Sequence, residues 1–118
     1  MTQQHFSSEL SFVKSTDMSV TYPEPGLIRR IGAYSDKLML AEHHMQRGWT
    51  GVRHSHPHEQ LVYVVTGRLK VVVGEINFEV AGGDSFIVRG GVEHEAAALE
   101  DCVVVDVFVP LRDDYRGG

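Results

Sequence analysis

The side chains best suited to chemistry form a histidine-rich segment in the middle of the chain, His54-Ser55-His56-Pro57-His58-Glu59-Gln60. On a β-strand, residues two apart point the same way, so His54 and His56 are expected to project together. Gln60, at the start of the next expected strand, can face the same cavity, and His94, which begins a later strand, is the candidate fourth ligand. Three neutral imidazoles and one oxygen suit a borderline divalent ion such as Mn, Fe, Co, Ni or Zn. The spacing therefore predicts one metal site made of His54, His56, Gln60 and His94.

Gln60 sets the electrostatic character of this predicted site, because an amide supplies an oxygen without a negative charge. A bound ion would keep its full positive charge, polarise carbonyl and hydroxyl oxygens and attract carboxylates. The protein ligands leave one or two positions open for water or substrate if the ion is five- or six-coordinate. A single histidine is usually an ordinary core or surface residue, but three of them at one turn between strands favour metal binding.

The other histidines are not expected to bind the ion. His58 is left out of the ligand set because its direction after Pro57 is not fixed by the pattern. His43 and His44 are neighbours on an expected strand, so at most one can point inward, and solvent is the expected environment. His5 lies near the N-terminus and has no accompanying pattern.

Short strand-like runs separated by glycine fill the chain from Gly26 onward, and no segment has a helical stripe of apolar residues. Many short strands with glycine-rich turns predict an all-β fold, an antiparallel sandwich or barrel. The runs expected as strands are Leu27–Tyr34, Lys37–Gln46, Val52–His56, Gln60–Thr66, Leu69–Val73, Asn77–Val80, Ser85–Val88, His94–Leu99 and Val103–Val109.

The ends of the chain have weaker patterns than the middle, and 118 residues correspond to one domain. Residues 1–24 are expected to form an N-terminal arm or edge strand, because Pro23 and Pro25 indicate a break before the compact part. Residues 25–112 are expected to form the barrel, and residues 113–118 a polar C-terminal tail.

Two of the expected strands, Gln60–Thr66 and Cys102–Val109, are apolar on both faces. A strand with one solvent-exposed face should alternate apolar and polar residues. These two strands do not alternate in this way, so both of their faces are expected to be covered. In a chain this small the second cover can be another subunit, and we expect a homodimer that buries a sheet face. The alternative is a sandwich whose second sheet covers the outer faces.

Composition and charge exclude several other classes of protein. The net charge of −5 and the lack of a basic tract argue against nucleic acid as a partner. The single cysteine, Cys102, cannot form an internal disulfide, which favours a reducing compartment. The N-terminus does not resemble a signal peptide and no apolar stretch has membrane-spanning length. We therefore expect a cytoplasmic protein with neither membrane nor nucleic-acid partners.

Two motifs resemble those of the cupin family. The first motif begins and ends with a glycine and contains the metal-binding residues between them. It is matched here by Gly48, His54, His56, Gln60 and Gly67. The second motif is matched by Gly83, Gly91 and His94. Gln60 stands where the family usually has glutamate, Arg89 where it has proline and Ala98 where it has asparagine. The resemblance covers about residues 26 to 112 and implies a jelly-roll barrel, or double-stranded β-helix, with a metal inside.

A narrower resemblance is to the pectin-degradation KdgF group of cupins. It rests on the glutamine ligand, on His-Pro-His-Glu-Gln, on Asp-Ser-Phe-Ile-Val before the second motif, and on Asp106-Val107-Phe108 followed by Pro110-Leu111-Arg112. Members of that group convert 4,5-unsaturated uronates to linear ketonised sugars in pectin and alginate breakdown. The resemblance implies an enzyme of carbohydrate metabolism with an anionic sugar substrate, and Asp106, Phe108 and Arg112 as catalytic residues.

The residues support part of this independently. Asp106 is a carboxylate within a valine-rich strand, where burial is costly unless the charge is paired or lies near a cation. Strand alternation puts it on the face of Phe108, so it can point toward the metal and move a proton. Arg112 follows Pro110 and can reach back to bind a carboxylate with two hydrogen bonds. The alternative for Asp106 is a structural carboxylate, but a functional role is favoured. Without the resemblance, a solvated Arg112 and a Phe108 in the core would be the expected environments.

Two other functions fit the same residues. A metal-dependent dioxygenase would use three histidines on iron to activate oxygen, and glutamine need not prevent it. A non-catalytic sugar-binding or sensor cupin would need no general acid or base, so Asp106 would be dispensable.

Overall fold

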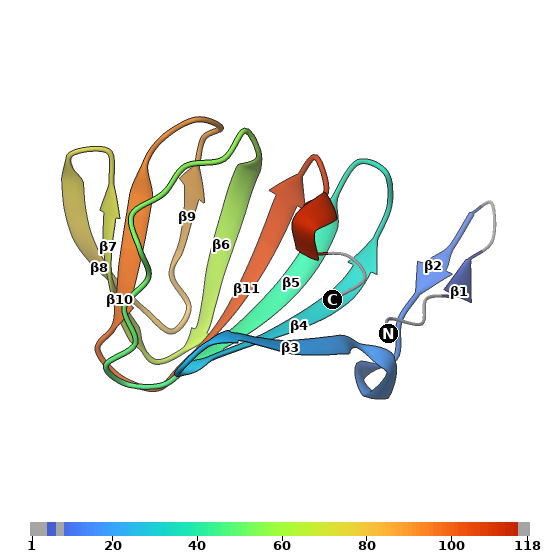
Figure 1. Cartoon of the computed structure of the whole chain (residues 1–118), viewed down its shortest axis with the longest axis horizontal. Coiled ribbons are helices and arrows are strands. Elements are labelled where there is room, and N and C mark those ends of the chain that lie inside the picture. The colour runs from blue at the N-terminus through green and yellow to red at the C-terminus, as the bar shows by residue number, and fades with distance from the viewer. Residues whose placement is uncertain (1–4, 7–8, 116–118) are drawn as a thin grey trace.

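The computed structural model describes residues 5–6 and 9–115, and most of the regular structure in these ranges is β-strand (Figure 1). The all-β prediction is confirmed. The elements are β1 (His5–Phe6), β2 (Ser11–Phe12), η1 (Ser15–Asp17), β3 (Ser19–Glu24), β4 (Leu27–Tyr34), β5 (Met39–Met45), β6 (Glu59–Thr66), β7 (Arg68–Val73), β8 (Ile76–Ala81), β9 (Ser85–Val88), β10 (His94–Ala98), β11 (Cys102–Val109) and η2 (Asp113–Tyr115), where η marks a turn of 3-10 helix.

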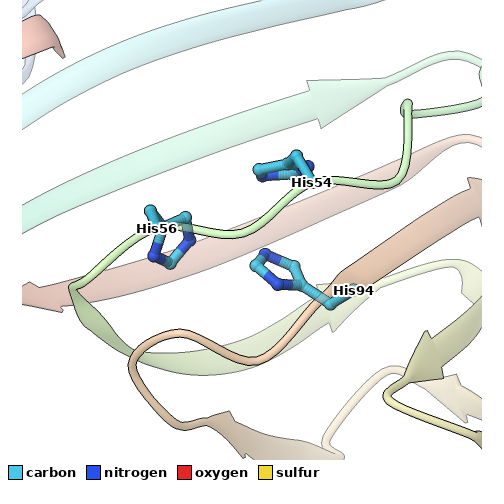
Figure 2. Close-up of side chains that lie close together, drawn as sticks. All are labelled: His54, His56 and His94. Atoms are coloured by element: carbon cyan, nitrogen blue, oxygen red, sulfur yellow. The ribbon is translucent and has the colours of Figure 1, made fainter.

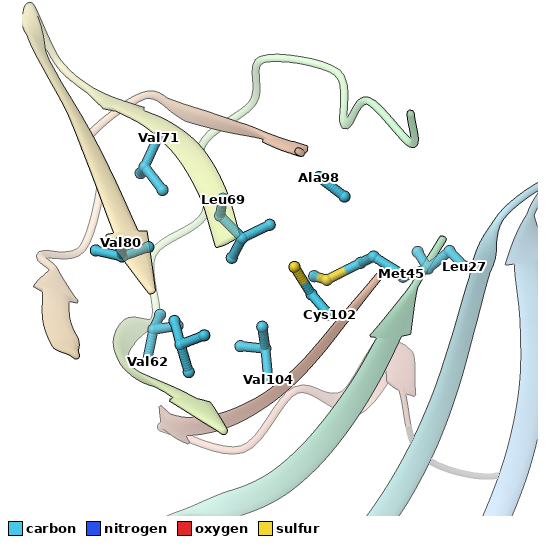
Figure 3. Close-up of a cluster of buried hydrophobic side chains, with 10 residues drawn as sticks. Leu27, Met45, Val62, Leu69, Val71, Val80, Ala98, Cys102 and Val104 are labelled. Carbon is cyan, nitrogen blue, oxygen red and sulfur yellow. The ribbon is translucent and has the colours of Figure 1, made fainter. Parts of the chain in front are cut away.

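Two antiparallel sheets enclose the core. A six-stranded sheet has the order β3-β4-β5-β11-β6-β9, and a three-stranded sheet has the order β10-β7-β8. Buried apolar side chains of both sheets meet in one cluster between them (Figure 3), and these include Val62, Val64 and Val104 from the large sheet and Leu69, Val71 and Val80 from the small one. The arrangement is a jelly-roll barrel with an apolar core between its two sheets.

Strand alternation decides what faces that interior. Along β5, Met39, Ala41, His43 and Met45 are buried while the residues between them are half-exposed. Along β11, the buried positions include Asp106 and alternate with half-exposed valines. The large sheet therefore turns two polar groups, His43 and Asp106, toward the inside of the barrel.

The segment expected as the strand Val52–His56 is a loop, and that prediction was wrong. The chain between β5 and β6 runs beside β10 and pairs with it only through two isolated bridges, Thr50 with Ala97 and His54 with His94. Val52 is 79% exposed, so the apolar residue that suggested a buried strand lies at the surface.

The strand β3 lies within residues 1–24, which were expected to form an N-terminal arm or edge strand, and it contains Pro23. It pairs with β4 only, so it forms an edge of the large sheet. The register between β3 and β4 shifts between Thr21 and Glu24, around Pro23. Proline is tolerated at an edge and at a bulge because no second neighbour needs its missing N–H.

The outer face of the large sheet is apolar and uncovered in the single chain. Leu61, Tyr63 and Val65 on β6 and Ile87 on β9 are 43–50% exposed. The small sheet packs against the opposite, inner face of β6 and β11, so the alternative that a second sheet covers the outer faces was wrong. In the described ranges, no helix combines the length and the apolar character that crossing a bilayer requires.

Candidate metal centre

The side chains of His54, His56 and His94 lie close together (Figure 2). His54 and His56 come from the loop before β6, and His94 begins β10. The backbones of His54 and His94 bind each other through two hydrogen bonds of 3.0 and 2.9 Å. One ligand nitrogen from each of the three rings lies within 4.8 Å of the others. The structure thus brings together three of the four residues expected to bind metal, without the regular strand that suggested their common direction.

Each of these rings is oriented by a backbone carbonyl. The Nδ1 atoms of His54, His56 and His94 lie 2.8, 3.0 and 2.9 Å from the carbonyl oxygens of Val52, His58 and Val92. A carbonyl only accepts hydrogen bonds, so each Nδ1 has the proton and each Nε2 keeps its lone pair. This is the usual way in which proteins fix the tautomer of metal-binding histidines.

The environment also keeps two of the rings neutral. Burial lowers the pKa of His56, and the positive charge of Arg112 lowers it further. Burial likewise lowers the pKa of His94. A neutral imidazole is the form that binds a metal, so both shifts favour ligation.

Gln60, the expected fourth ligand, lies beside the three histidines. Its amide nitrogen donates a 2.7 Å hydrogen bond to Oδ1 of Asp106, so its Oε1 faces the histidines and lies 3.1 Å from Nε2 of His56. Two adjacent ligand atoms of one ion, each bound at about 2.1 Å, are separated by about 3 Å. The donor set of His54, His56, His94 and Gln60 therefore fits one divalent ion and can hold it.

The loop that holds His56 is packed tightly against the next turn of the barrel. The N–H of Gly91 donates a 2.8 Å hydrogen bond to the carbonyl of His56. A Cβ atom at Gly90 would overlap the carbonyl of Pro57, so this position requires glycine. The second motif thus positions a ligand of the first motif as well as His94.

Asp106 lies beside the metal ligands on the inner face of β11. It is 3% exposed, and both of its oxygens have partners: Oδ1 accepts from Gln60, and Oδ2 lies 2.7 Å from Nδ1 of His43. The expectation that Asp106 faces the cavity agrees with this placement.

His43 is the residue that sequence reasoning placed in the wrong environment. We expected solvent, but His43 is 6% exposed, and Nε of Arg29 donates a 3.0 Å hydrogen bond to its Nε2. Its neighbour His44 points to the outer face and pairs with Glu42. The available signal was alternation, since His43 shares its face with Met39, Ala41 and Met45.

Phe108 and Arg112 lie near the ligands but differ in their contacts. Phe108 is 1% exposed, and its ring meets that of His56 edge-on at 5.9 Å between centroids. The Arg112 guanidinium lies 5.2 Å from the centre of the Phe108 ring and donates two hydrogen bonds, of 2.9 and 2.6 Å, to Asp114. Burial acts to lower the pKa of Arg112, but the hydrogen bonds to Asp114 and Tyr115 raise it overall.

Tyr115 belongs to the segment expected to be a tail, yet it packs into the site from η2. Its ring meets Phe108 edge-on at 5.4 Å, and the guanidinium carbons of Arg29 and Arg112 lie 3.6 and 4.2 Å from its centre. His58, the histidine left out of the ligand set, is half-buried, and its Nδ1 has no hydrogen-bond partner among the described residues.

A cavity of about 280 Å³ adjoins these groups. Its polar lining includes His54, Gln60, His94, Arg29, His43 and Asp106, and the rest is mainly apolar. Arg112 is not part of this lining. A concave, largely apolar site with a few convergent polar groups is typical of sites that bind small molecules.

Comparison with known proteins agrees with the fold. A family model described as a cupin domain matches residues 41–108. The chain belongs to the cupin family. The matched range includes all four candidate metal ligands of this cupin, and also His43, Asp106 and Phe108, whereas Arg29, Arg112 and Tyr115 lie outside it.

Among curated proteins, this cupin is 33% identical over 92 residues to the pectin degradation protein KdgF of Dickeya dadantii (strain 3937), a match that covers 76% of this chain and 84% of the relative. Among solved structures, KdgF from Halomonas sp. has 35% identity and a TM-score of 0.81, with 88% of this chain and 96% of that chain covered. An RmlC-like cupin from Shewanella frigidimarina has 29% identity and a TM-score of 0.85, with 96% and 98% covered. The expected resemblance to cupins and to KdgF is confirmed.

Proposed function

We propose that this cupin is a metal-dependent enzyme that opens and ketonises 4,5-unsaturated uronates of the galacturonate type. The observation that supports this most strongly is the buried Asp106 carboxylate, which touches the candidate metal ligand Gln60 and lines the cavity. The similarity to two KdgF proteins supports this substrate class, because the curated relative is named for pectin degradation.

The metal would be one divalent transition ion, Mn, Fe, Ni, Co or Zn, held by His54, His56, Gln60 and His94. When bound, it supplies a Lewis acid that stabilises negative charge on oxygen. Gln60 would contribute a neutral ligand, and its hydrogen bond to Asp106 would tie the ligand set to the acid–base group.

Asp106 is the proposed acid–base residue. As a carboxylate it accepts the proton of the anomeric hydroxyl, the bond from the anomeric carbon to the ring oxygen breaks, and the electron pair stays on that oxygen. The anomeric carbon becomes an aldehyde carbonyl, and the resulting enolate takes the proton back from Asp106 at its carbon end and becomes a ketone. No electrons or atoms are gained or lost overall, so the reaction needs no oxidant, in contrast to a dioxygenase.

Arg112 and Phe108 are proposed to position the sugar. Phe108 would present an apolar ring beside His56. Arg112 would bind the substrate carboxylate as a bidentate partner, in place of or together with Asp114, which now occupies two of its donors. An anionic substrate is thus proposed for a protein whose net charge is −5, with local cations overcoming the overall field.

We also propose that the protein works as a cytoplasmic homodimer. The exposed apolar side chains Leu61, Tyr63 and Val65 of β6 and Ile87 of β9 form a continuous outer face together with the valines of β11. An apolar sheet face of this kind favours a second copy of the chain as its cover.

The test is to incubate the metal-loaded protein with unsaturated galacturonate and to follow the loss of ultraviolet absorbance from the conjugated double bond. Asp106→Ala is expected to abolish turnover while the metal content stays at the wild-type level. Turnover that requires oxygen would instead support the dioxygenase, and binding of the sugar without turnover would support a sensor. Loss of metal together with turnover in Asp106→Ala would make Asp106 structural.

A further inference from the structure

Two groups behind Asp106, the buried His43 and the half-buried Arg29, take no part in the proposed reaction. His43 lies in the middle of β5, and its Nδ1 is 2.7 Å from Oδ2 of Asp106. Arg29 lies on β4 directly opposite His43, and its Nε is 3.0 Å from Nε2 of that ring. With Gln60 these residues form one chain of hydrogen bonds that leads from a candidate metal ligand to an arginine.

The hydrogen-bond partners of His43 determine which of its ring nitrogens has the proton. A guanidinium only donates hydrogen bonds, so Nε2 of His43 must be an acceptor and the ring must be neutral. A neutral ring with a free Nε2 has its proton on Nδ1, which then donates to Oδ2 of Asp106. The amide of Gln60 donates to Oδ1. Asp106 is therefore an acceptor at both oxygens, as a proton-accepting residue must be.

The large sheet and the C-terminal turn η2 hold these hydrogen-bonded side chains in place. His43 is opposite Val104 on β11, and Asp106 is opposite Ala41 on β5, so the two polar residues are diagonal neighbours on the inner face. The guanidinium carbon of Arg29 lies 3.6 Å from the centre of the Tyr115 ring, a cation–π contact that restricts the arginine from its other side.

We propose that His43 is a positioning residue for Asp106, and that Arg29 fixes the tautomer in which His43 can do so. The inference rests on the proposed function of Asp106 as the proton acceptor. His43 keeps the plane of the carboxylate fixed while Gln60 keeps the other oxygen next to the metal ligands. Without the hydrogen bond from Nδ1, the carboxylate can rotate away from the cavity.

Two amide substitutions separate the two hydrogen bonds of His43. In His43→Asn, the amide nitrogen can take the place of Nδ1 and donate to Asp106, while the contact with Arg29 is lost. In His43→Gln, the longer side chain puts its oxygen near the place of Nε2, so it can accept from Arg29 but no longer reaches Asp106. His43→Leu removes both interactions.

Loss of a partner that orients a functional group typically costs about 10–100-fold in activity. We expect His43→Gln and His43→Leu to lower kcat by about that factor with KM changed less than about twofold, because the residues proposed to bind the sugar, Phe108 and Arg112, are unchanged. His43→Asn should keep kcat within about fivefold of wild type. All three variants should retain the wild-type metal content, which also checks that they fold.

A further measurement tests the tautomer of His43 on which this positioning role depends. Nitrogen NMR of histidine-labelled protein should show the His43 proton on Nδ1, and His43→Asn identifies the signal.

The outcomes separate this inference from the proposed function. A proton on Nε2 of His43, or His43→Gln with wild-type kcat, overturns the positioning role. A wild-type protein without activity on unsaturated uronates, but with the His43 proton on Nδ1, overturns the proposed reaction and supports the hydrogen-bond arrangement.

Discussion

Replacing Gln60 with glutamate puts a second carboxylate beside Asp106. In the structure the amide nitrogen of Gln60 donates a 2.7 Å hydrogen bond to Oδ1 of Asp106. Gln60→Glu replaces this donor with an acceptor, so two oxygens meet where an N–H and an oxygen now meet. Two charges about 4 Å apart repel by about 4 kcal/mol at an effective dielectric constant near 20. The pair is therefore expected to take up one proton and share it.

The size of the effect follows from the repulsion. About 4 kcal/mol corresponds to about 3 pH units, and isolated carboxylic acids titrate near pH 4. The doubly ionised form of such a pair then becomes dominant only above about pH 7. A shared proton blocks the proton acceptor, so turnover is expected to fall by about tenfold at pH 6 and to recover toward pH 9. Metal binding should be kept, because a carboxylate is also a good ligand.

The assay compares kcat/KM of wild type and Gln60→Glu from pH 5.5 to 9, with the metal content measured on the same samples. Glu59→Gln is the matched control, because it makes the reverse change at the exposed neighbouring position. A Gln60→Glu protein with full metal content and a wild-type profile at pH 6 would show that the carboxylate of Asp106 is not the proton acceptor.

Two further predictions concern pH and assembly. Burial lowers the pKa values of His56 and His94 in the folded chain, so below about pH 6.5 the unfolded chain binds protons that the folded chain resists. As the pH falls below about 6.5, the metal-free protein should therefore lose stability, measured as the urea concentration at the unfolding midpoint. Over the same pH range the metal-loaded protein should lose its ion, measured as metal content. A urea midpoint and a metal content that do not change with pH would contradict this prediction. Tyr63→Glu, at the centre of the outer apolar face, should convert a dimer into a monomer in sedimentation, whereas Asn77→Glu on the exposed face of β8 should not. A monomeric wild type would contradict this.

The sequence was most informative where the chemistry depends on residues close together in the chain. The spacing of His54, His56 and Gln60 around one turn predicted a metal site, and the two glycines that precede His94 matched the second motif of a known family. Alternation along Cys102–Val109 put Asp106 and Phe108 on one face, and both are buried. These inferences depend on local geometry, which the sequence specifies directly.

Other features depend on which strands become neighbours. Alternation allowed only one of His43 and His44 to point inward, but it could not tell which one. In the folded sheet, where β5 pairs with β11, His43 is the buried residue. The contact of His43 with Arg29 requires the register of β4 on β5, between residues fourteen positions apart. Tyr115 enters the site only because η2 folds back over Phe108.

The sequence by itself determined an all-β chain, the family and the set of residues that can bind a metal, because these follow from residue type and short-range spacing. The tertiary structure decided the groups that orient Asp106, and that Arg112 faces Asp114 while Arg29 lines the cavity. These contacts join residues far apart in the chain. Sheet register sets their distances, and register follows from the packing of the whole barrel.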